Sequence, residues 1–394
     1  MEEWKTYRLE DLTIDGKGHY GIGAPAVDYD ENKFTYLRIT DINDDGSLNY
    51  SGLKSVDDPE ASKYLLQEGD IVFARTGNST GRSYYYEPSD GQFVFAGFLI
   101  KFSLDPTKVN PRFLKYYTHS KMYYEWVQSF DTGATRGNIN AQTFGSMEIN
   151  LPPRVVQDRL VEILRSIDDK IKLNNRINHN LEEQAQALYK SWFLDFEPFK
   201  DGIFIDSELG MIPEGWHVKN LLEIANLFDS KRKPLSGNER SKMDKVYPYY
   251  GATSIMDYVD DFIFDGTYLL MGEDGSVMTE DGFPFLQYVT GKFWPNNHAH
   301  VMQGCSGFST EMLHCALLRK VIKSSVTGAV QAKISQANMK KILFACPPRN
   351  ILAAFDTILQ KTYSQMRNIS SQNATLSLVR DNMLPHLMSS KLGF

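Results

Sequence analysis

The sequence predicts an α+β fold in which two mixed, strand-rich domains are combined with two long coiled-coil helices. Three observations lead to this prediction: a sequence repeat about half as long as the chain, short apolar runs typical of buried strands, and near-heptad apolar spacing after two Pro-Pro pairs. With 394 residues, the chain is long enough for each domain to bury a core of its own.

The chain contains a tandem repeat whose three anchors occur in the same order in both halves. The stretch WKTYRLEDL from Trp4 is echoed by WHVKNLLEI from Trp216, an offset of 216 − 4 = 212. The loop TGATRGNIN from Thr132 matches TGAVQAKIS from Thr327, and the LPPR and CPPR tetrapeptides that follow share this offset of 327 − 132 = 195. Thr-Gly and Pro-Pro pairs are common in turns, but three ordered anchors make chance a poor explanation. The repeat unit is too long for a solenoid, so we expect two domain-sized copies, the second with the shorter variable part.

The segments ahead of the helices have the composition of short strands. Two apolar runs, Asp70–Ala74 and Tyr268–Met271, each follow a glycine closely and resemble buried strands. Phe93–Ala96 and Phe98–Phe102 are further strand candidates. After a turn, the sequence pattern predicts a single helix that ends at Trp126.

Each copy ends in a long predicted helix that begins at a Pro-Pro pair, where proline is tolerated in the first turn. Apolar residues then recur at steps of three and four, which indicates a coiled-coil seam about 60 Å long. Asn174, Asn175, Asn178 and Asn180 lie midway along the first helix, and asparagine on a seam fixes register at a cost in stability. The alternative is a helical hairpin packed onto one globular core. The apolar positions are Val156, Leu160, Ile163, Ile167, Ile171, Ile177, Leu181 and Leu188 in the first helix, and Leu352, Phe355, Leu359, Met366, Ile369, Leu376, Val379 and Met383 in the second.

Changes in these patterns divide the chain into five segments. The stretch from Phe196 to Gly215 contains several turn pairs and resembles a linker. The predicted boundaries are 1–150 for the first domain, 151–195 for the central helix, 196–215 for the linker, 216–345 for the second domain and 346–394 for the C-terminal helix.

The chain resembles the specificity (S) subunit of type I restriction–modification enzymes over essentially its full length. The resemblance rests on GDIVFARTG from Gly69, the two Thr-Gly-Ala loops and the Pro-Pro helix starts. It also rests on LYKSWFLDF from Leu188, LGMIPEGW from Leu209 and the closing LPHLMSS from Leu384. No single motif is diagnostic, but their order within a duplicated frame is specific.

This resemblance implies two target-recognition domains, each reading one half of a bipartite, asymmetric DNA site. It also implies two antiparallel helices that set the spacing and dock two methyltransferase (M) subunits, with restriction (R) subunits added outside. A repeat folded about a pseudo-twofold axis would likewise place equivalent helices antiparallel. The copies diverge most between their anchors, where residues that read different half-sites are expected.

Candidate DNA contacts in the first domain lie in residues 71–86, which contain no acidic side chain. Arginine can bind guanine with two hydrogen bonds, asparagine can bind adenine in the same way, and hydroxyl groups bind phosphates. Gly77 and Gly81 should let this loop approach the duplex closely. The alternative is an ordinary polar loop beside a strand. The candidates are Arg75, Thr76, Asn78, Thr80 and Arg82.

The repeated loop offers Arg136 in the first copy and Gln331 with Lys333 in the second. Because the loop precedes a helix in both copies, a purely architectural role is the competing interpretation.

In the second domain, residues 231–245 form the most basic stretch of the chain, opposed by only two acids. It is the best candidate for phosphate binding, although a solvated charged loop is the alternative. Residues 257–282, with eight acids and no Lys or Arg, should face away from DNA, except that Glu273 or Asp274 could accept from a cytosine amino group. For His298 and His300 a structural role is expected, since two histidines alone make a poor metal site. The candidate contacts are Lys231, Arg232, Lys233, Arg240, Lys242, Lys292 and Asn297.

No catalytic motif was found in the sequence: it lacks a Walker phosphate loop, the Asn-Pro-Pro-aromatic motif of methyltransferases and His-Glu-x-x-His. We therefore expect a non-catalytic subunit without a cofactor. The net charge of −7 weakens the DNA interpretation, but phosphate affinity depends on local basic surface, part of which partners can supply. Three cysteines without metal-ligand spacing, no apolar stretch long enough to span a membrane and no signal core suggest a cytoplasmic protein. The alternatives are a coiled-coil scaffold that binds protein without reading DNA, and an enzyme with an unrecognised site.

Overall fold

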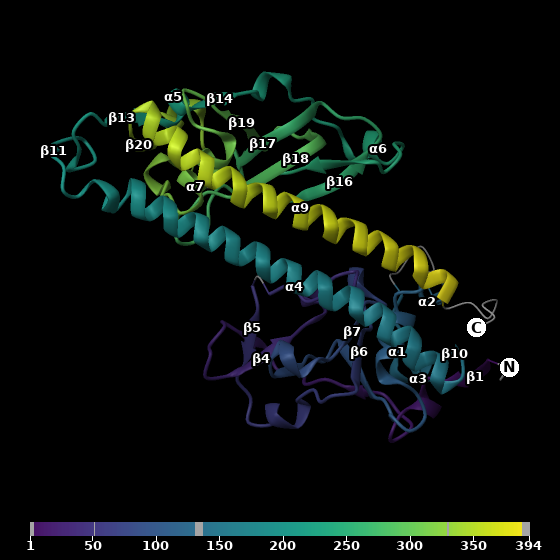
Figure 1. Ribbon diagram of the computed structural model, residues 1–394. Helices are drawn as coiled ribbons and strands as arrows, with labels where there is room; N and C mark the ends of the chain where they lie inside the picture. Colours follow the sequence, from purple (N-terminus) through teal and green to yellow (C-terminus); the bar gives the residue numbers. More distant parts are fainter. Residues whose placement is uncertain (1–3, 51, 131–136, 329–330, 388–394) are drawn as a thin grey trace. The chain divides into compact units, whose positions relative to one another are not determined.

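The computed structural model describes residues 4–50, 52–130, 137–328 and 331–387. The chain divides into two compact units, Met1–Leu173 with Asn373–Phe394, and Asn174–Gln372. Each unit contains one strand-rich domain, called domain 1 and domain 2 below, together with part of each long helix (Figure 1). The predicted α+β class is confirmed.

Domain 1 contains two four-stranded sheets, and most residues of their central strands are buried. One sheet has the order β2-β9-β6-β7 and the other the order β3-β5-β4-β8. All five residues of β6 are buried, as the apolar run DIVFA predicts. The strands are β2 (His19–Tyr20), β9 (Leu99–Ser103), β6 (Asp70–Ala74) and β7 (Ser83–Tyr85), and β3 (Ala26–Val27), β5 (Lys54–Val56), β4 (Phe34–Leu37) and β8 (Phe93–Phe95).

Domain 2 is built on one six-stranded sheet of order β14-β19-β17-β18-β15-β16. Its first four strands repeat the frame β2-β9-β6-β7 of domain 1: Ala74 at the end of β6 pairs with Leu99 of β9, and Gly272 at the end of β17 pairs with Ala299 of β19. The two domains therefore share a core sheet and differ in what is added to it. The strands are β14 (Ala225–Leu227), β19 (Ala299–Gly304), β17 (Phe264–Gly272), β18 (Leu286–Pro295), β15 (Tyr247–Tyr250) and β16 (Ile255–Val259).

The sequence anchors of the repeat correspond to equivalent strand pairs. In domain 1, β1 (Lys5–Arg8) pairs antiparallel with β10 (Glu148–Leu151). In domain 2, β13 (His217–Asn220) pairs in the same way with β20 (Leu343–Cys346). Short helices precede β10 and β20 at matching positions, α3 (Ala141–Gly145) and α8 (Gln336–Met339). The structure thus confirms the tandem repeat.

The helix expected to reach Trp126 is in fact two helices, α1 (Pro111–Tyr117) and α2 (Lys121–Gln128). The chain turns between them, and the Ser120 hydroxyl caps α2 by accepting a hydrogen bond from the backbone N–H of Tyr123. The break lets the ring of Tyr123 become fully buried.

The remaining helices of domain 2 are α5 (Leu221–Ile224), α6 (Gly237–Arg240) and α7 (Thr310–Leu318).

The segment predicted as a linker, residues 196–215, is folded. It contains the 3-10 turn η6 (Glu197–Phe199) and a hairpin of β11 (Phe204–Ile205) and β12 (Ile212–Pro213). Ile212 is 2% exposed and belongs to the core of the second unit, and the Phe199 ring packs edge-on against Trp216. The segment is therefore part of that unit's packing.

The long helices α4 (Arg154–Phe193) and α9 (Arg349–Leu387) run antiparallel, as predicted. In the second unit, the Asn174 side-chain amide donates to Gln372 (2.7 Å), and the Asn178 amide donates to Ser370 (3.1 Å). Residue numbers thus rise along α4 as they fall along α9. In the first unit, Arg380 of α9 donates to the Asp168 carboxylate of α4 (3.0 Å).

The apolar seam between these helices is not continuous. Asn174 is 1% exposed, consistent with a buried polar residue that specifies register, whereas Ile177 is 37% and Val379 42% exposed. Near the end of α4 the contacts become aromatic: the Phe355 ring lies 4.7 Å from Phe193, measured between centroids. The helices are held by their packing on the domains as well as by the seam.

Phe355→Ala should lower the free energy of unfolding of the second unit by about 3–5 kcal/mol, because it leaves a cavity where a fully buried ring contacts Tyr189, Trp192 and Phe193. Ile358→Ala on the same helix is the matched control, since Ile358 is 44% exposed. Denaturant unfolding followed by tryptophan fluorescence measures both. Equal losses for the two variants would contradict this packing.

Candidate DNA interface

In domain 1, three chain segments meet where the central strand β6 ends. The backbone N–H of Arg75, the first residue after β6, donates to the carbonyl of Phe98 (3.1 Å). The carbonyl of Arg75 accepts from the N–H of Ile139 (3.0 Å), which lies in the repeated loop. The strand end, the start of β9 and the loop are therefore fixed together. Arg136, predicted from the same loop, lies outside the described residues.

Domain 2 repeats this junction at the end of β17. The N–H of Glu273 donates to the carbonyl of His298 (2.8 Å), and its carbonyl accepts from the N–H of Ile334 (2.8 Å). Glu273 thus occupies the position of Arg75, and His298 that of Phe98. A cationic side chain in one domain is replaced by an acidic one in the other.

The guanidinium group of Arg75 is flanked by two aromatic rings. It lies 5.1 Å from the centroid of Tyr20 and 5.8 Å from that of Phe98. Its Nε atom is buried, and no hydrogen-bond partner for it is present among the described residues. Tyr20 is 44% and Phe98 56% exposed, so the aromatic pair also reaches the surface. Sequence reasoning singled out Arg75 but missed Tyr20 and Phe98, because only the sheet brings β2 and β9 beside β6.

The other predicted contacts of domain 1 differ in how free their polar groups are. Asn78 is exposed and Thr76 partly buried. The Thr80 hydroxyl lies 2.8 Å from the backbone carbonyl of Gly77 and 3.0 Å from that of Gly137. Arg82 donates to the Asp44 carboxylate (2.6 Å), so part of its charge is already neutralised.

Gly81 has an internal reason to be glycine. Its φ is +86°, and an added Cβ would collide with the side chain of Val127. The Tyr123 hydroxyl donates to its carbonyl (2.6 Å). Close approach to DNA, as predicted from the sequence, is therefore not needed to explain this residue.

The basic stretch of domain 2 contains both free and paired cations. Lys231, Lys233 and Lys242 are exposed, and no carboxylate pairs with them among the described residues. Arg240, in contrast, donates to Asp257 (3.0 Å). Exposed lysines of this kind are typical of groups that neutralise phosphates.

Arg232 belongs to a buried polar network and not to the exposed loop surface. Its side chain is 12% exposed, and its guanidinium donates to Glu273 (2.6 Å) and to a backbone carbonyl (2.7 Å). His300, 1% exposed, bridges the Asp229 carboxylate (Nδ1, 2.6 Å) and another backbone carbonyl (Nε2, 2.8 Å). Burial favours a raised pKa for Asp229, but the hydrogen bond to His300 and the nearby positive charges lower it.

This network also contains metal-ligand residue types, since ligand atoms of Asp229, Glu273 and His300 lie within 4.8 Å of one another. The Arg232 guanidinium already supplies positive charge to both carboxylates, at 3.6 Å from Asp229 and 2.6 Å from Glu273. The positive charge that these carboxylates require is therefore supplied by Arg232.

The remaining predicted contacts of domain 2 lie at the surface. The Lys292 ammonium lies 4.5 Å from the Phe262 ring centroid, and the Lys333 ammonium lies 3.5 Å from Glu273. The exposed candidates are Lys292, Asn297, Gln331 and Lys333.

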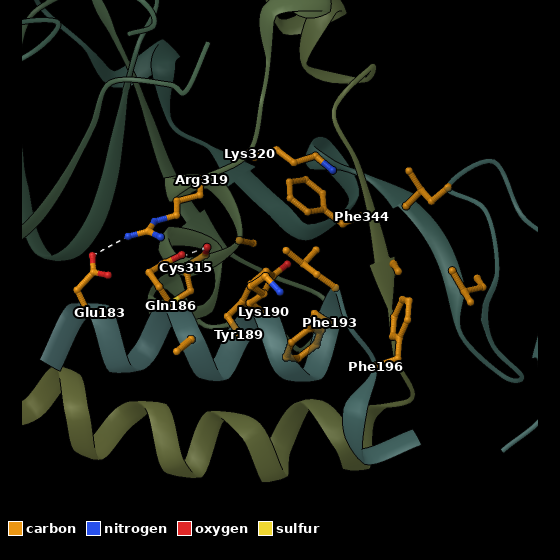
Figure 2. A pocket seen from close by; sticks show the side chains of 16 residues that line it. Glu183, Gln186, Tyr189, Lys190, Phe193, Phe196, Cys315, Arg319, Lys320 and Phe344 are labelled. Atoms are coloured by element: carbon orange, nitrogen blue, oxygen red, sulfur yellow. Dashed lines mark hydrogen bonds and ion pairs between the residues drawn. The ribbon is translucent and has the colours of Figure 1, made fainter. Parts of the chain in front are cut away.

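The second unit also contains a cavity of about 570 Å³ beside the end of α4 (Figure 2). The aromatic side chains of Tyr189, Phe193 and Phe344 line it. The Lys320 ammonium lies 5.0 Å from the Phe344 ring, and burial lowers its pKa. Nearby, Arg319 is paired with Glu183 (2.6 Å), as the dashed line in Figure 2 marks.

The family model described as "type I restriction modification DNA specificity domain" matches residues 1–183 and 213–372. The chain belongs to this family. The match covers both copies of the repeat, so the resemblance seen in the sequence is confirmed.

Individual members of this family are similar to the chain over much or all of its length. The MjaIX specificity subunit of Methanocaldococcus jannaschii is 27% identical over 71% of this chain and 68% of its own length. The HindI specificity subunit of Haemophilus influenzae is 20% identical over the full length of both. The S subunit structure from M. genitalium aligns with a TM-score of 0.51 at 16% identity, covering 98% of this chain and 96% of that one, which shows a shared fold. None of the helices in the described part of the chain combines the length and apolar character needed to span a bilayer.

Arg232 and Lys233 are neighbours in sequence with different expected effects. Arg232→Ala removes the guanidinium that pairs with the partly buried carboxylates of Asp229 and Glu273 and should lower the free energy of unfolding by about 3 kcal/mol. Lys233→Ala should leave stability within about 0.5 kcal/mol, weaken DNA binding across sequences and reduce its salt slope by about one. Thermal unfolding and DNA titrations at several salt concentrations measure these effects. A stable Arg232→Ala protein with a reduced salt slope would mean that Arg232 contacts phosphate.

Proposed function

We propose that the chain is the non-catalytic DNA specificity subunit of a type I restriction–modification complex, in which domain 1 (residues 1–150) reads one half of a bipartite, asymmetric site and domain 2 (residues 216–345) the other. The observation that carries this proposal is that one sheet frame is presented twice with different side chains at equivalent positions. The clearest case is Arg75 in domain 1 and Glu273 in domain 2. Two readers with unlike hydrogen-bonding groups select unlike bases, which makes the site asymmetric.

Phosphate contacts should hold each reader in register on the duplex without contributing sequence preference. Lys231, Lys233 and Lys242 are suited to this task because they are exposed and lack a carboxylate partner among the described residues. A chain with a net charge of −7 needs further positive surface, and the proposed partner subunits supply it.

Methylation and cleavage belong, in this proposal, to partners: two methyltransferase subunits and the restriction subunits. The cavity beside α4 supports partner docking, because exposed Leu194 (58%) and Leu209 (40%) border a pocket lined by aromatic rings. The complex would act in the cytoplasm, where the free thiols of Cys305, Cys315 and Cys346 stay reduced.

A protein-binding scaffold without DNA readout is the second candidate, and the same cavity favours it. A DNA pull-down of the full chain with its methyltransferase, followed by methylome mapping, separates the two. A defined bipartite methylated motif supports the specificity subunit, whereas methylation without sequence preference supports the scaffold.

Exchanging residues 216–345 for the same region of a relative should change only one half of the methylated motif, because each domain has its own sheet and core. Methylome sequencing of cells that carry the exchanged chain measures this. The purified chain alone, given S-adenosylmethionine, is the control and should transfer no methyl group. A change in both halves would rule out independent readers.

The long helices should act as a ruler for the gap between half-sites. Seven residues inserted near Asn174–Asn178, together with seven near residues 369–373, preserve the side chains that face the partner helix. Each heptad adds about 10 Å, or about three base pairs, and turns the second half-site by about 100°. The non-specific gap should therefore lengthen by about three base pairs, with reduced affinity and unchanged half-sites. Insertions of three or four residues serve as the out-of-phase control, and methylation at the original spacing after the heptad insertions would contradict the ruler.

A further inference from the structure

We infer that Tyr20 and Phe98 are positioning residues that hold Arg75 to bind a guanine in the half-site of domain 1, and that domain 2 carries no guanine reader at the equivalent position. This inference rests on the proposed function and names one of its specificity-determining positions.

The aromatic pair limits where the guanidinium group can go. Tyr20 comes from β2 and Phe98 from the residue before β9, and their ring centroids lie 5.1 and 5.8 Å from Cζ of Arg75. The guanidinium plane stacks favourably on aromatic faces, and a long side chain held in this way loses less freedom when it binds DNA. The Tyr20 hydroxyl accepts from the N–H of Ala141 (3.2 Å), which fixes this ring in turn.

Among the described arginines of the predicted interface, Arg75 is the one without a carboxylate partner. Arg82, Arg232 and Arg240 each pair with a carboxylate, at 2.6, 2.6 and 3.0 Å respectively. No ion pair or side-chain hydrogen bond of Arg75 is present within the described ranges, and its buried Nε lacks a partner there. Because no such bond engages the guanidinium within the described ranges, its Nη donors can bind a ligand that supplies acceptors.

The surroundings favour a base over a phosphate as this ligand. The O6 and N7 atoms of guanine match the two-pronged donor geometry of arginine in the major groove. The neighbouring rings of Tyr20 and Phe98 are 44% and 56% exposed, and apolar faces suit base edges and thymine methyl groups better than charged phosphates. Lys233 and Lys242, in contrast to Arg75, have exposed side chains, which is typical of residues that contact phosphates.

Domain 2 has an acidic network at the same place. Glu273 replaces Arg75, and His298 replaces Phe98 at the matching backbone hydrogen bond. Asp229 lies where Tyr20 lies in domain 1: Tyr20 pairs with Ile100, and Asp229 contacts His300, the counterpart of Ile100. The carboxylate of Glu273 is bound by Arg232 and is 15% exposed, so this position offers DNA no free cation. The two half-sites should therefore differ at this base.

The test uses the full chain assembled with its methyltransferase subunits and begins from the motif that methylome mapping provides. Each guanine of the motif is replaced in synthetic duplexes by 7-deazaguanine, which lacks the N7 acceptor. One replacement in the domain 1 half-site should weaken wild-type binding about tenfold. In Arg75→Ala the same replacement should have no further effect.

Tyr20→Leu and Phe98→Leu should reduce the sensitivity to that replacement severalfold, whereas Tyr20→Phe, which keeps the ring and loses only the hydroxyl that binds Ala141, should have a smaller effect. His298→Leu is the matched control, because it changes the equivalent position of domain 2 and should leave the domain 1 half-site unaffected. An unchanged preference for the domain 2 half-site shows that each domain 1 variant is folded.

Undiminished sensitivity to 7-deazaguanine in Arg75→Ala would overturn the guanine contact. Full sensitivity in both leucine variants would overturn the positioning role of the rings. If the wild-type complex binds duplexes without sequence preference, the proposed function itself fails, and that result differs from either of these.

Discussion

The antiparallel pairing of the first and last strands of each domain is the constraint on which the rest of the structure depends. β1 pairs with β10, with Lys5 opposite Leu151, and β13 pairs with β20, with His217 opposite Cys346. Each closing strand leads into a long helix through two prolines, which precede the first helical residues Arg154 and Arg349 and so remove no hydrogen bond from the helix. The backbone of each domain is thereby tied to the start of its helix, and every strand in between is positioned relative to that point.

Within this frame, the side chains that face the end of the central strand can vary without disturbing the sheet. Arg75 and Glu273 make the same backbone hydrogen bonds, so exchanging their charge leaves the ladder intact. Each charge must then be balanced locally. Arg75 is flanked by aromatic rings, whereas Glu273 is bound by Arg232. In such a domain, the backbone hydrogen bonds stabilise the sheet, and the side chains at the strand end can change specificity without altering those bonds.

Tertiary packing overrides the local sequence pattern at three places in the structure. The helix through residues 111–128 breaks at Ser120, since burying Tyr123 in the core of the first unit outweighs continuous helix. The segment 196–215 has the composition of a linker, yet Ile212 and Phe199 find apolar partners around Trp216 in the second unit. In the same way, the sequence grouped Arg232 with Lys231 and Lys233, whereas in the structure its guanidinium lies in a network with Glu273 and Asp229.

The sequence by itself determined the repeat, the buried strand Asp70–Ala74, the long helices and the family, because these depend on periodicity and on anchors that lie close together along the chain. It also singled out Arg75 from its position in a loop without acids. Only the tertiary structure decided which cations are free and which are paired, and which aromatic rings stand beside Arg75. Those properties depend on strands such as β2, β6 and β9 that are distant in sequence and become neighbours only through hydrogen bonding in the sheet.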